Sequence, residues 1–97
     1  MAGRFSLGAV VATPGALDLL STLRIDPHSL LVRHALGDWG YLDDADRRLN
    51  DEAVVDGSRI FSSYVVGTGG DKLWVITEAA DDYGIRGSTC ILTPAEY

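Results

Sequence analysis

The stretch RIFSSYVVGTGGDKLWVITE, residues 59–78, decides the fold class of this chain. Residues 59–66 and 72–78 each sort into two alternating sets of side chains that are rich in β-branched and aromatic types, a pattern that predicts strands. Between them, GTGGD at residues 67–71 supplies the glycines that a short hairpin loop needs. The stretch therefore predicts two antiparallel strands joined by a hairpin.

Two further strands are predicted, one near each end of the chain. Residues 5–12 are apolar and partly β-branched, which favours a short strand near the N-terminus. Residues 89–93 read as a strand that Pro94 ends, after a polar, glycine-containing loop over residues 79–88.

Three helices are predicted between the first strand and the hairpin. Thr-Pro at residues 13–14 and Asp-Pro at residues 26–27 each place a capping side chain before a proline at the first helical position. The second of these helices ends near Gly37, which can adopt the left-handed conformation that closes a helix. Asp43 can cap the third helix, and Gly57 follows its end.

We therefore expect an α+β fold in the order β-α-α-α-β-β-β: a small antiparallel sheet of three to four strands, covered on one face by three helices. Because globular domains usually contain about 100–200 residues, residues 1–97 should form a single domain. The residues expected to face the interior of that domain are Ile60, Tyr64, Leu73, Val75 and Ile91, or else the alternate residues of the same strands.

Composition narrows the class of protein. With 46% hydrophobic and 23% charged residues, the chain is too apolar to be disordered, and it has no run of about 18 apolar residues that would cross a membrane. The N-terminal residues do not resemble a secretory signal, so we expect a cytoplasmic protein. Its one cysteine, Cys90, excludes an internal disulfide.

The charge is acidic and unevenly placed. The net charge of -6 argues against a protein whose affinity comes from neutralising phosphates, and residues 38–56 contain seven acidic and two basic side chains. These acids either form an ordinary solvated helix face or a patch that binds a basic partner. The candidate binding residues are Asp43, Asp44, Asp46, Asp51 and Glu52.

A second set of residues suggests a pocket. Arg33 and His34 precede Asp38 by one helical turn, which is a grouping that acid–base chemistry can use and that a helix C-terminus also favours. If the fold brings the two tryptophans close to this group, the cleft would suit a planar or anionic small molecule. The members of this alternative pocket are Arg33, His34, Asp38, Trp39, Trp74 and Glu78.

Other catalytic and cofactor signatures are missing from the sequence. His28 and His34 are six residues apart, whereas two zinc ligands on one helix face are four apart, and we expect no metal and no cofactor. Ser62, Ser63 and Cys90 fall within strands and lack the glycine-flanked turn that exposes a nucleophile.

Two motifs resemble those of a known family. The segments RHALGDWG at residues 33–40 and WVITE at residues 74–78 are its most specific ones, and weaker similarity runs from residue 6 to residue 97. They resemble a family of small bacterial proteins related to plasmids and other mobile elements, from which residues 80–88 depart as an insertion. The resemblance implies a genomic setting and no particular chemistry.

Three functions remain open at this point. The first is a non-enzymatic accessory protein of a mobile element that binds a nucleic-acid-handling complex stoichiometrically through its acidic surface, as an anti-CRISPR or anti-restriction inhibitor would. The second is a small-molecule-binding module or enzyme that uses the alternative pocket, and the third is a regulator that binds DNA together with a partner. For the first we expect a protein partner, no direct nucleic acid contact, no membrane, and a monomer or weak homodimer.

Overall fold

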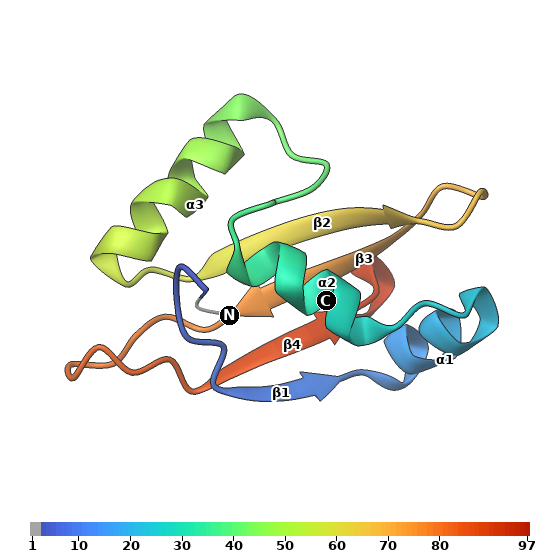
Figure 1. The fold of residues 1–97 in the computed structure, drawn as a ribbon, viewed down its shortest axis with the longest axis horizontal. Helices are drawn as coiled ribbons and strands as arrows, with labels where there is room; N and C mark the ends of the chain where they lie inside the picture. The colour runs from blue at the N-terminus through green and yellow to red at the C-terminus, as the bar shows by residue number, and fades with distance from the viewer. Residues whose placement is uncertain (1–2) are drawn as a thin grey trace.

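The order of elements agrees with the sequence-based prediction. Residues 3–97 are described in a computed structural model, so the first two residues of the N-terminal stretch considered above lie outside the description. The chain is an α+β fold in the order β-α-α-α-β-β-β, followed by one short 3-10 helix (Figure 1). The elements are β1 (Ala9–Ala12), α1 (Pro14–Leu23), α2 (Pro27–Ala35), α3 (Asp44–Asp56), β2 (Ile60–Val66), β3 (Asp71–Thr77), β4 (Ser88–Leu92) and η1 (Pro94–Glu96).

The four strands form one sheet in the order β1-β4-β3-β2. The pairings β2–β3 and β3–β4 are antiparallel, as predicted, with Val75 opposite Ser62 on one side and Ile91 on the other. The pairing β1–β4 is parallel, so the prediction of a wholly antiparallel sheet is wrong. The physical reason is that three helices separate β1 from the hairpin, and such a crossover returns the chain in its original direction.

The first strand is also shorter than expected. Gly8 has a φ of +65°, which breaks the extended backbone before Ala9. Phe5 instead turns inward, and its ring packs against those of His34 and Trp39 at centroid distances of 5.1 and 6.1 Å. Aromatic burial therefore outweighs the strand pattern of residues 5–8.

The predicted capping residues are confirmed. The side chains of Thr13, Asp26 and Asp43 each accept a hydrogen bond from a backbone N–H in the first turn of α1, α2 and α3. Gly57 ends α3 with a φ of +85°. These local signals fix where the helices begin, because they satisfy backbone groups that have no partner within the helix.

Helices α1 and α2 cover one face of the sheet, and α3 lies beside the outer edge of β2 (Figure 1). The five residues predicted to face the interior are all buried. Most of them pack with Ala16 and Leu20 of α1 and Leu30 of α2, whereas Ala53 of α3 belongs to a second cluster with Trp39 and Ile60. The prediction of three helices on one face is therefore correct for two of them.

The other face of the sheet carries a row of aromatic side chains. Phe61 and Trp74 point to that face, and η1 brings Tyr97 beside them. The rings of Phe61 and Trp74 lie edge to face at 4.9 Å, and those of Trp74 and Tyr97 at 5.5 Å. This row is only partly buried, since Tyr97 is exposed.

Candidate functional site

His34, a member of the alternative pocket, is the centre of a buried polar chain. Its Nδ1 lies 2.6 Å from the Ser62 hydroxyl, and its Nε2 lies 2.9 Å from that of Thr77. The chain continues from Thr77 to Thr89 over 2.6 Å, and Thr89 donates to the carbonyl of Leu7 over 2.7 Å. His34, Ser62, Thr77 and Thr89 are each 0% exposed.

The direction of these hydrogen bonds fixes the tautomer of His34. The single hydroxyl proton of Thr89 goes to Leu7, so Thr77 must donate to Thr89, and the Nε2–H of His34 must donate to Thr77. Nδ1 then accepts from Ser62. Burial, assisted by the charge of Arg86, lowers the pKa of His34 to about 4, so the ring is neutral near pH 7. Both ring nitrogens are therefore occupied in the interior and unavailable to a ligand.

The remaining residues of the RHALGDWG segment build the turn that follows α2. Arg33 forms an ion pair of 2.7 Å with Asp38 and lies over the ring of Tyr64, whose hydroxyl donates to the backbone carbonyl of Asp38. The Asp38 carboxylate accepts from the N–H of Gly40, and the ion pair lowers its pKa. Since His34 is hydrogen-bonded to Thr77 of the WVITE segment, the two motifs contact each other in the interior of the fold.

The six residues of the alternative pocket do not meet in one cavity. His34 and Trp39 are buried beneath α2, with their rings 6.0 Å apart. Arg33 and Asp38 form an exposed pair, and Trp74 points to the opposite face of the sheet. Glu78 is exposed beyond the end of β3. The structure thus gives no support to a small-molecule site made of these residues.

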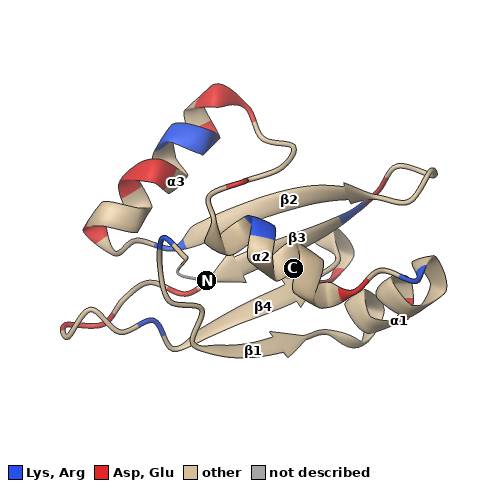
Figure 2. Ribbon diagram, viewed as in Figure 1, with Lys and Arg blue, Asp and Glu red and all other residues tan. Residues whose placement is uncertain are grey.

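The five acidic residues of the other predicted site have different roles. Asp43 caps α3, and Asp51 accepts hydrogen bonds from the Trp39 indole N–H at 3.1 Å and from Arg4 at 3.2 Å, which together lower its pKa. Asp44, Asp46 and Glu52 are exposed, and their carboxylates make no hydrogen bond or ion pair with other groups of residues 3–97. Figure 2 shows acidic residues along α3, with basic residues between them. Three of the five are therefore available to a partner.

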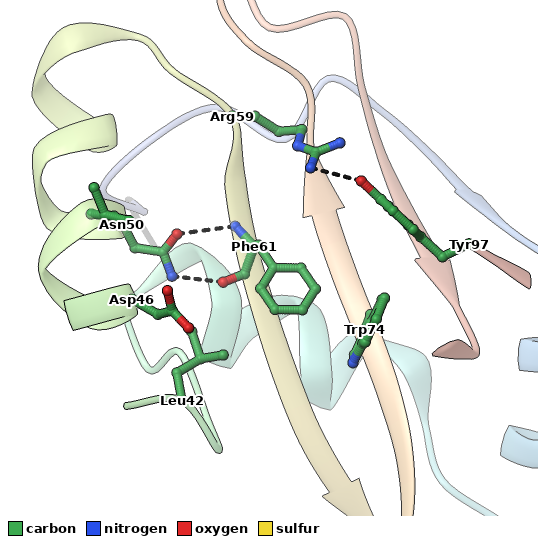
Figure 3. A pocket seen from close by; sticks show the side chains of 8 residues that line it. Leu42, Asp46, Asn50, Arg59, Phe61, Trp74 and Tyr97 are labelled. Carbon is green, nitrogen blue, oxygen red and sulfur yellow. Dashed lines mark hydrogen bonds between the residues drawn. The ribbon is translucent and has the colours of Figure 1, made fainter. Parts of the chain in front are cut away.

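An aromatic hollow of about 400 Å³ lies next to the acidic helix. Figure 3 shows Phe61 at its centre, Trp74 on one side and Asp46 of α3 on the other. Arg59 donates to the hydroxyl of Tyr97 over 2.9 Å at a separate end of the hollow. The residues that line it are Leu42, Asp46, Leu49, Asn50, Arg59, Phe61, Trp74 and Tyr97.

Asn50 connects α3 to the floor of this hollow. Its side-chain amide donates to the carbonyl of Phe61 over 2.6 Å and accepts from the N–H of the same residue over 3.1 Å (Figure 3). This pair of bonds holds α3 against the edge of β2 and places Asp46 beside the aromatic rings. The hollow thus offers a carboxylate on the α3 side, a guanidinium at the Tyr97 end, and apolar rings between them.

Most of this hollow is not predicted by the sequence. The alternative pocket groups Trp74 with residues of α2, of the turn after it and with Glu78, and neither predicted site includes Phe61, Arg59 or Tyr97. The alternation that predicted the hairpin could have grouped Phe61 with Trp74, because both belong to the outward sets of paired strands. No sequence signal indicates that η1 returns Tyr97 to the same face.

The loop between β3 and β4 is fastened to the end of α3. Arg86 is 5% exposed and donates to the backbone carbonyls of Ala53, Ser58 and Glu78 at 2.8–3.0 Å. Tyr83 at the tip of the loop is 88% exposed. Most of the segment predicted as an insertion, residues 80–88, is therefore a loop held against the end of α3, and it contains two acidic residues, Asp81 and Asp82.

Comparisons with known proteins identify no relative: no protein-family model, no curated protein and no solved structure matches the chain. The resemblance to plasmid-related proteins thus stays a prediction. Among residues 3–97, no three His, Cys, Asp or Glu side chains are grouped so that they could hold a metal ion. Within the same part of the chain, every helix is too short or too polar to cross a bilayer.

Proposed function

We propose that this protein binds a basic segment of another protein through an acidic–aromatic face, which consists of Asp46, Glu52 and the rings of Phe61, Trp74 and Tyr97. The observation that carries the proposal is the position of Asp46, which belongs both to the exposed acids of α3 and to the wall of the aromatic hollow. An acidic helix alone would be an ordinary solvated surface. The combination of a carboxylate with partly exposed aromatic rings is a surface to which arginine and lysine side chains bind well.

The geometry of α3 extends this face beyond the hollow. Asp46, Leu49 and Glu52 follow one another at intervals of three residues, so they form a row that winds around α3, with Glu52 about 120° from Asp46 and beside a neighbouring hollow. Leu49 is 62% exposed and lines the hollow together with Asp46. A peptide that crosses the rings and continues around α3 would therefore meet an apolar side chain and then a second carboxylate.

Arg59 favours a peptide over a simple cation. Its guanidinium uses one donor on Tyr97, and an arginine side chain has several more. Peptide carbonyl groups can accept from those donors, while a basic side chain of the same peptide reaches Asp46. A small inorganic cation would gain nothing from the rings or from Arg59.

Nucleic-acid-handling proteins are the partner class that suits this chemistry best. Such proteins line their channels with arginine and lysine, so an acidic protein can occupy the positions that phosphates would take. An anti-CRISPR or anti-restriction inhibitor is one form that such binding would take. The net charge of -6 supports this role, since it also speeds the approach of a basic partner.

The experiment compares two charge-reversed variants with the same net charge. Asp46→Lys with Glu52→Lys changes the face, whereas Asp18→Lys with Asp71→Lys changes exposed carboxylates elsewhere. Binding of a fluorescent nine-residue arginine peptide is measured by anisotropy at low salt. We expect the first variant to weaken binding at least about tenfold, equivalent to about 1.4 kcal/mol, and the second to weaken it much less. Equal weakening by both variants would show that only net charge matters.

The partner class is tested with the same proteins as bait. Lysate of the native host is passed over the wild type and both variants, and the retained proteins are identified by mass spectrometry. A nucleic-acid-handling protein that is retained by the wild type and the Asp18, Asp71 variant, and lost with the Asp46, Glu52 variant, supports the proposal. Retention of such a protein by all three baits places its contact elsewhere.

A further inference from the structure

The two edges of the sheet differ in whether their outward backbone groups have hydrogen-bond partners. At the β2 edge, the N–H and carbonyl of Phe61 are taken by the Asn50 side chain. Ser63 accepts from the N–H of Tyr41 over 2.6 Å and donates to the carbonyl of Trp39 over 3.1 Å. The outward backbone groups of these two β2 residues are therefore satisfied within the molecule, which leaves little for another strand to pair with.

The β1 edge is open. Ala9 and Thr13 direct their N–H groups to β4, where they donate to the carbonyls of Gly87 and Ile91 over 3.0 Å. Because successive residues of a strand point their backbone groups to opposite sides, Val10 and Ala12 direct theirs away from the sheet. Neither has a backbone partner on that side among residues 3–97. In Figure 1, β1 forms the lower border of the sheet, and no other strand lies beyond it.

The open edge carries no charge. Residues 5–17 contain no Asp, Glu, Lys or Arg, in a chain whose net charge is -6. Exposed edges are usually protected by charged side chains, by proline or by a covering loop, and here only Pro14 limits the edge at one end. Two copies of this chain repel each other over most of their surface, but not along this segment.

An apolar groove accompanies the edge. Between β1 and α2 lies a hollow of about 450 Å³ whose lining includes Leu7 and Val10 on one side and Leu31 and Leu36 on the other. Val10 and Leu36 are each 46% exposed. A strand that pairs with β1 would cover these side chains, and its burial of apolar surface would add to the backbone hydrogen bonds.

From these observations we propose that a second copy of the chain pairs its β1 with this edge in the antiparallel direction, about a two-fold axis at Val11. In that register Val10 of one copy exchanges backbone hydrogen bonds with Ala12 of the other. The two Val11 side chains, each 52% exposed in the single chain, meet on the helix-free face. The two grooves then face each other across the axis, as the self-complementary interface of a two-fold dimer requires.

The dimer leaves the acidic–aromatic face accessible. The order β1-β4-β3-β2 places α3 at the edge opposite to β1, so each copy presents its face at one end of a continuous double-length sheet. A partner with two basic segments could then bind both ends at once and gain avidity. The pairing itself does not depend on the proposed function.

The experiment measures molar mass by sedimentation equilibrium over a hundredfold range of concentration. We expect the wild type to shift from monomer to dimer, and Val11→Lys to remain a monomer because it brings two ammonium groups together at the axis. Val65→Lys is the matched control, since Val65 is 48% exposed on β2, at the other edge of the sheet, and it should dimerise like the wild type. A wild type that stays monomeric, or a Val11→Lys protein that still dimerises, overturns the proposal.

A second measurement needs no variant. Amide hydrogen exchange of the wild type is followed at the lowest and highest concentrations of the same range. The amides of Val10 and Ala12 should exchange at least about tenfold more slowly at the high concentration, because both become hydrogen-bonded in the dimer. Equal exchange rates at the two concentrations would contradict pairing at this edge.

Discussion

At the scale of single residues, His34 shows how a side chain that suggests catalysis can serve the interior instead. Its ring joins α2 to β2 and β3, because Ser62 and Thr77 bind its two nitrogens and belong to different strands. A buried polar group costs free energy unless it is fully hydrogen-bonded, and this chain of bonds satisfies every member down to the carbonyl of Leu7. Such a network specifies one arrangement of the helix on the sheet.

The stability of the protein should therefore fall in mild acid. The pKa of His34 is about 4 in the folded chain and near its ordinary value of 6.5 in the unfolded chain, so between these values only the unfolded chain binds the proton. The contribution of His34 is complete above pH 6.5 and decreases as the pH falls towards 4, by about 3 kcal/mol in all. Urea unfolding from pH 7 to pH 4 should show this loss.

The matched variant for that measurement is His34→Gln. It should be less stable than the wild type at pH 7 and should lack the part of the pH dependence that His34 supplies. If the two proteins lose stability in parallel between pH 6.5 and pH 4, His34 is not the titrating group. An NMR titration of the His34 ring that gives a pKa near 6.5 would lead to the same conclusion.

Two glycines with similar backbone angles should respond differently to substitution. Gly40 has a φ of +76°, and a Cβ there would overlap the carbonyl oxygen of Ser63, whereas Gly70 has a φ of +80° and open space around it. Gly70→Ala should cost about 1 kcal/mol through the left-handed backbone alone. Gly40→Ala should cost at least about 3 kcal/mol, because it must also move residues 39–41 away from β2. Thermal melts of both variants would contradict this account if their losses were equal.

At the scale of elements, local signals account for what the sequence could predict. The capping residues Thr13, Asp26 and Asp43 act on backbone groups within a few residues, so their effect can be inferred from sequence. The parallel pairing of β1 with β4 and the position of α3 depend on contacts between distant segments. Asn50 illustrates the difference, since nothing in its neighbourhood indicates that its amide binds the edge of β2.

Asn50→Ala should loosen α3 from the sheet. It removes both bonds to Phe61 and leaves the partly covered N–H and carbonyl of that residue without a partner, at a cost of about 1–3 kcal/mol. Amide exchange at Phe61 should accelerate more than exchange in β4. Leu49→Ala is the neighbouring control, because Leu49 is 62% exposed and should change stability by less than about 0.5 kcal/mol. Unchanged exchange at Phe61 in Asn50→Ala would show that the side chain does not hold the edge.

Arg86 should hold the loop between β3 and β4 against the rest of the fold. Arg86→Met keeps much of the apolar length of the side chain but removes the donors to Ala53, Ser58 and Glu78, and we expect a loss of about 2–4 kcal/mol. Limited proteolysis should then cut residues 80–88 faster than in the wild type. The exposed Arg48 provides the control, since Arg48→Met should leave stability and cleavage nearly unchanged. A loop as resistant in Arg86→Met as in the wild type would contradict this role.

At the scale of the whole molecule, the two proposed interactions require that their surfaces do not overlap. The acidic–aromatic face and the open β1 edge lie towards opposite edges of the sheet. One can therefore bind a partner while the other pairs with a second copy. The acidity of α3 can be predicted from the composition of the sequence alone. The hollow beside Asp46 could not be predicted, because Phe61, Trp74 and Tyr97 meet only through strand pairing and the return of η1.

Binding at the acidic–aromatic face can be located by NMR titration of the ¹⁵N-labelled protein with the nine-residue arginine peptide. The two tryptophan indole N–H signals serve as internal probes, because Trp74 lines the hollow and Trp39 is buried and bound to Asp51. We expect the signals of the Trp74 indole and of the amides around Asp46, Glu52 and Phe61 to shift together, while those of the Trp39 indole and the amide of Asp18 stay in place. Shifts centred on α1 or the hairpin loop, with the Trp74 indole unmoved, would contradict binding at this face.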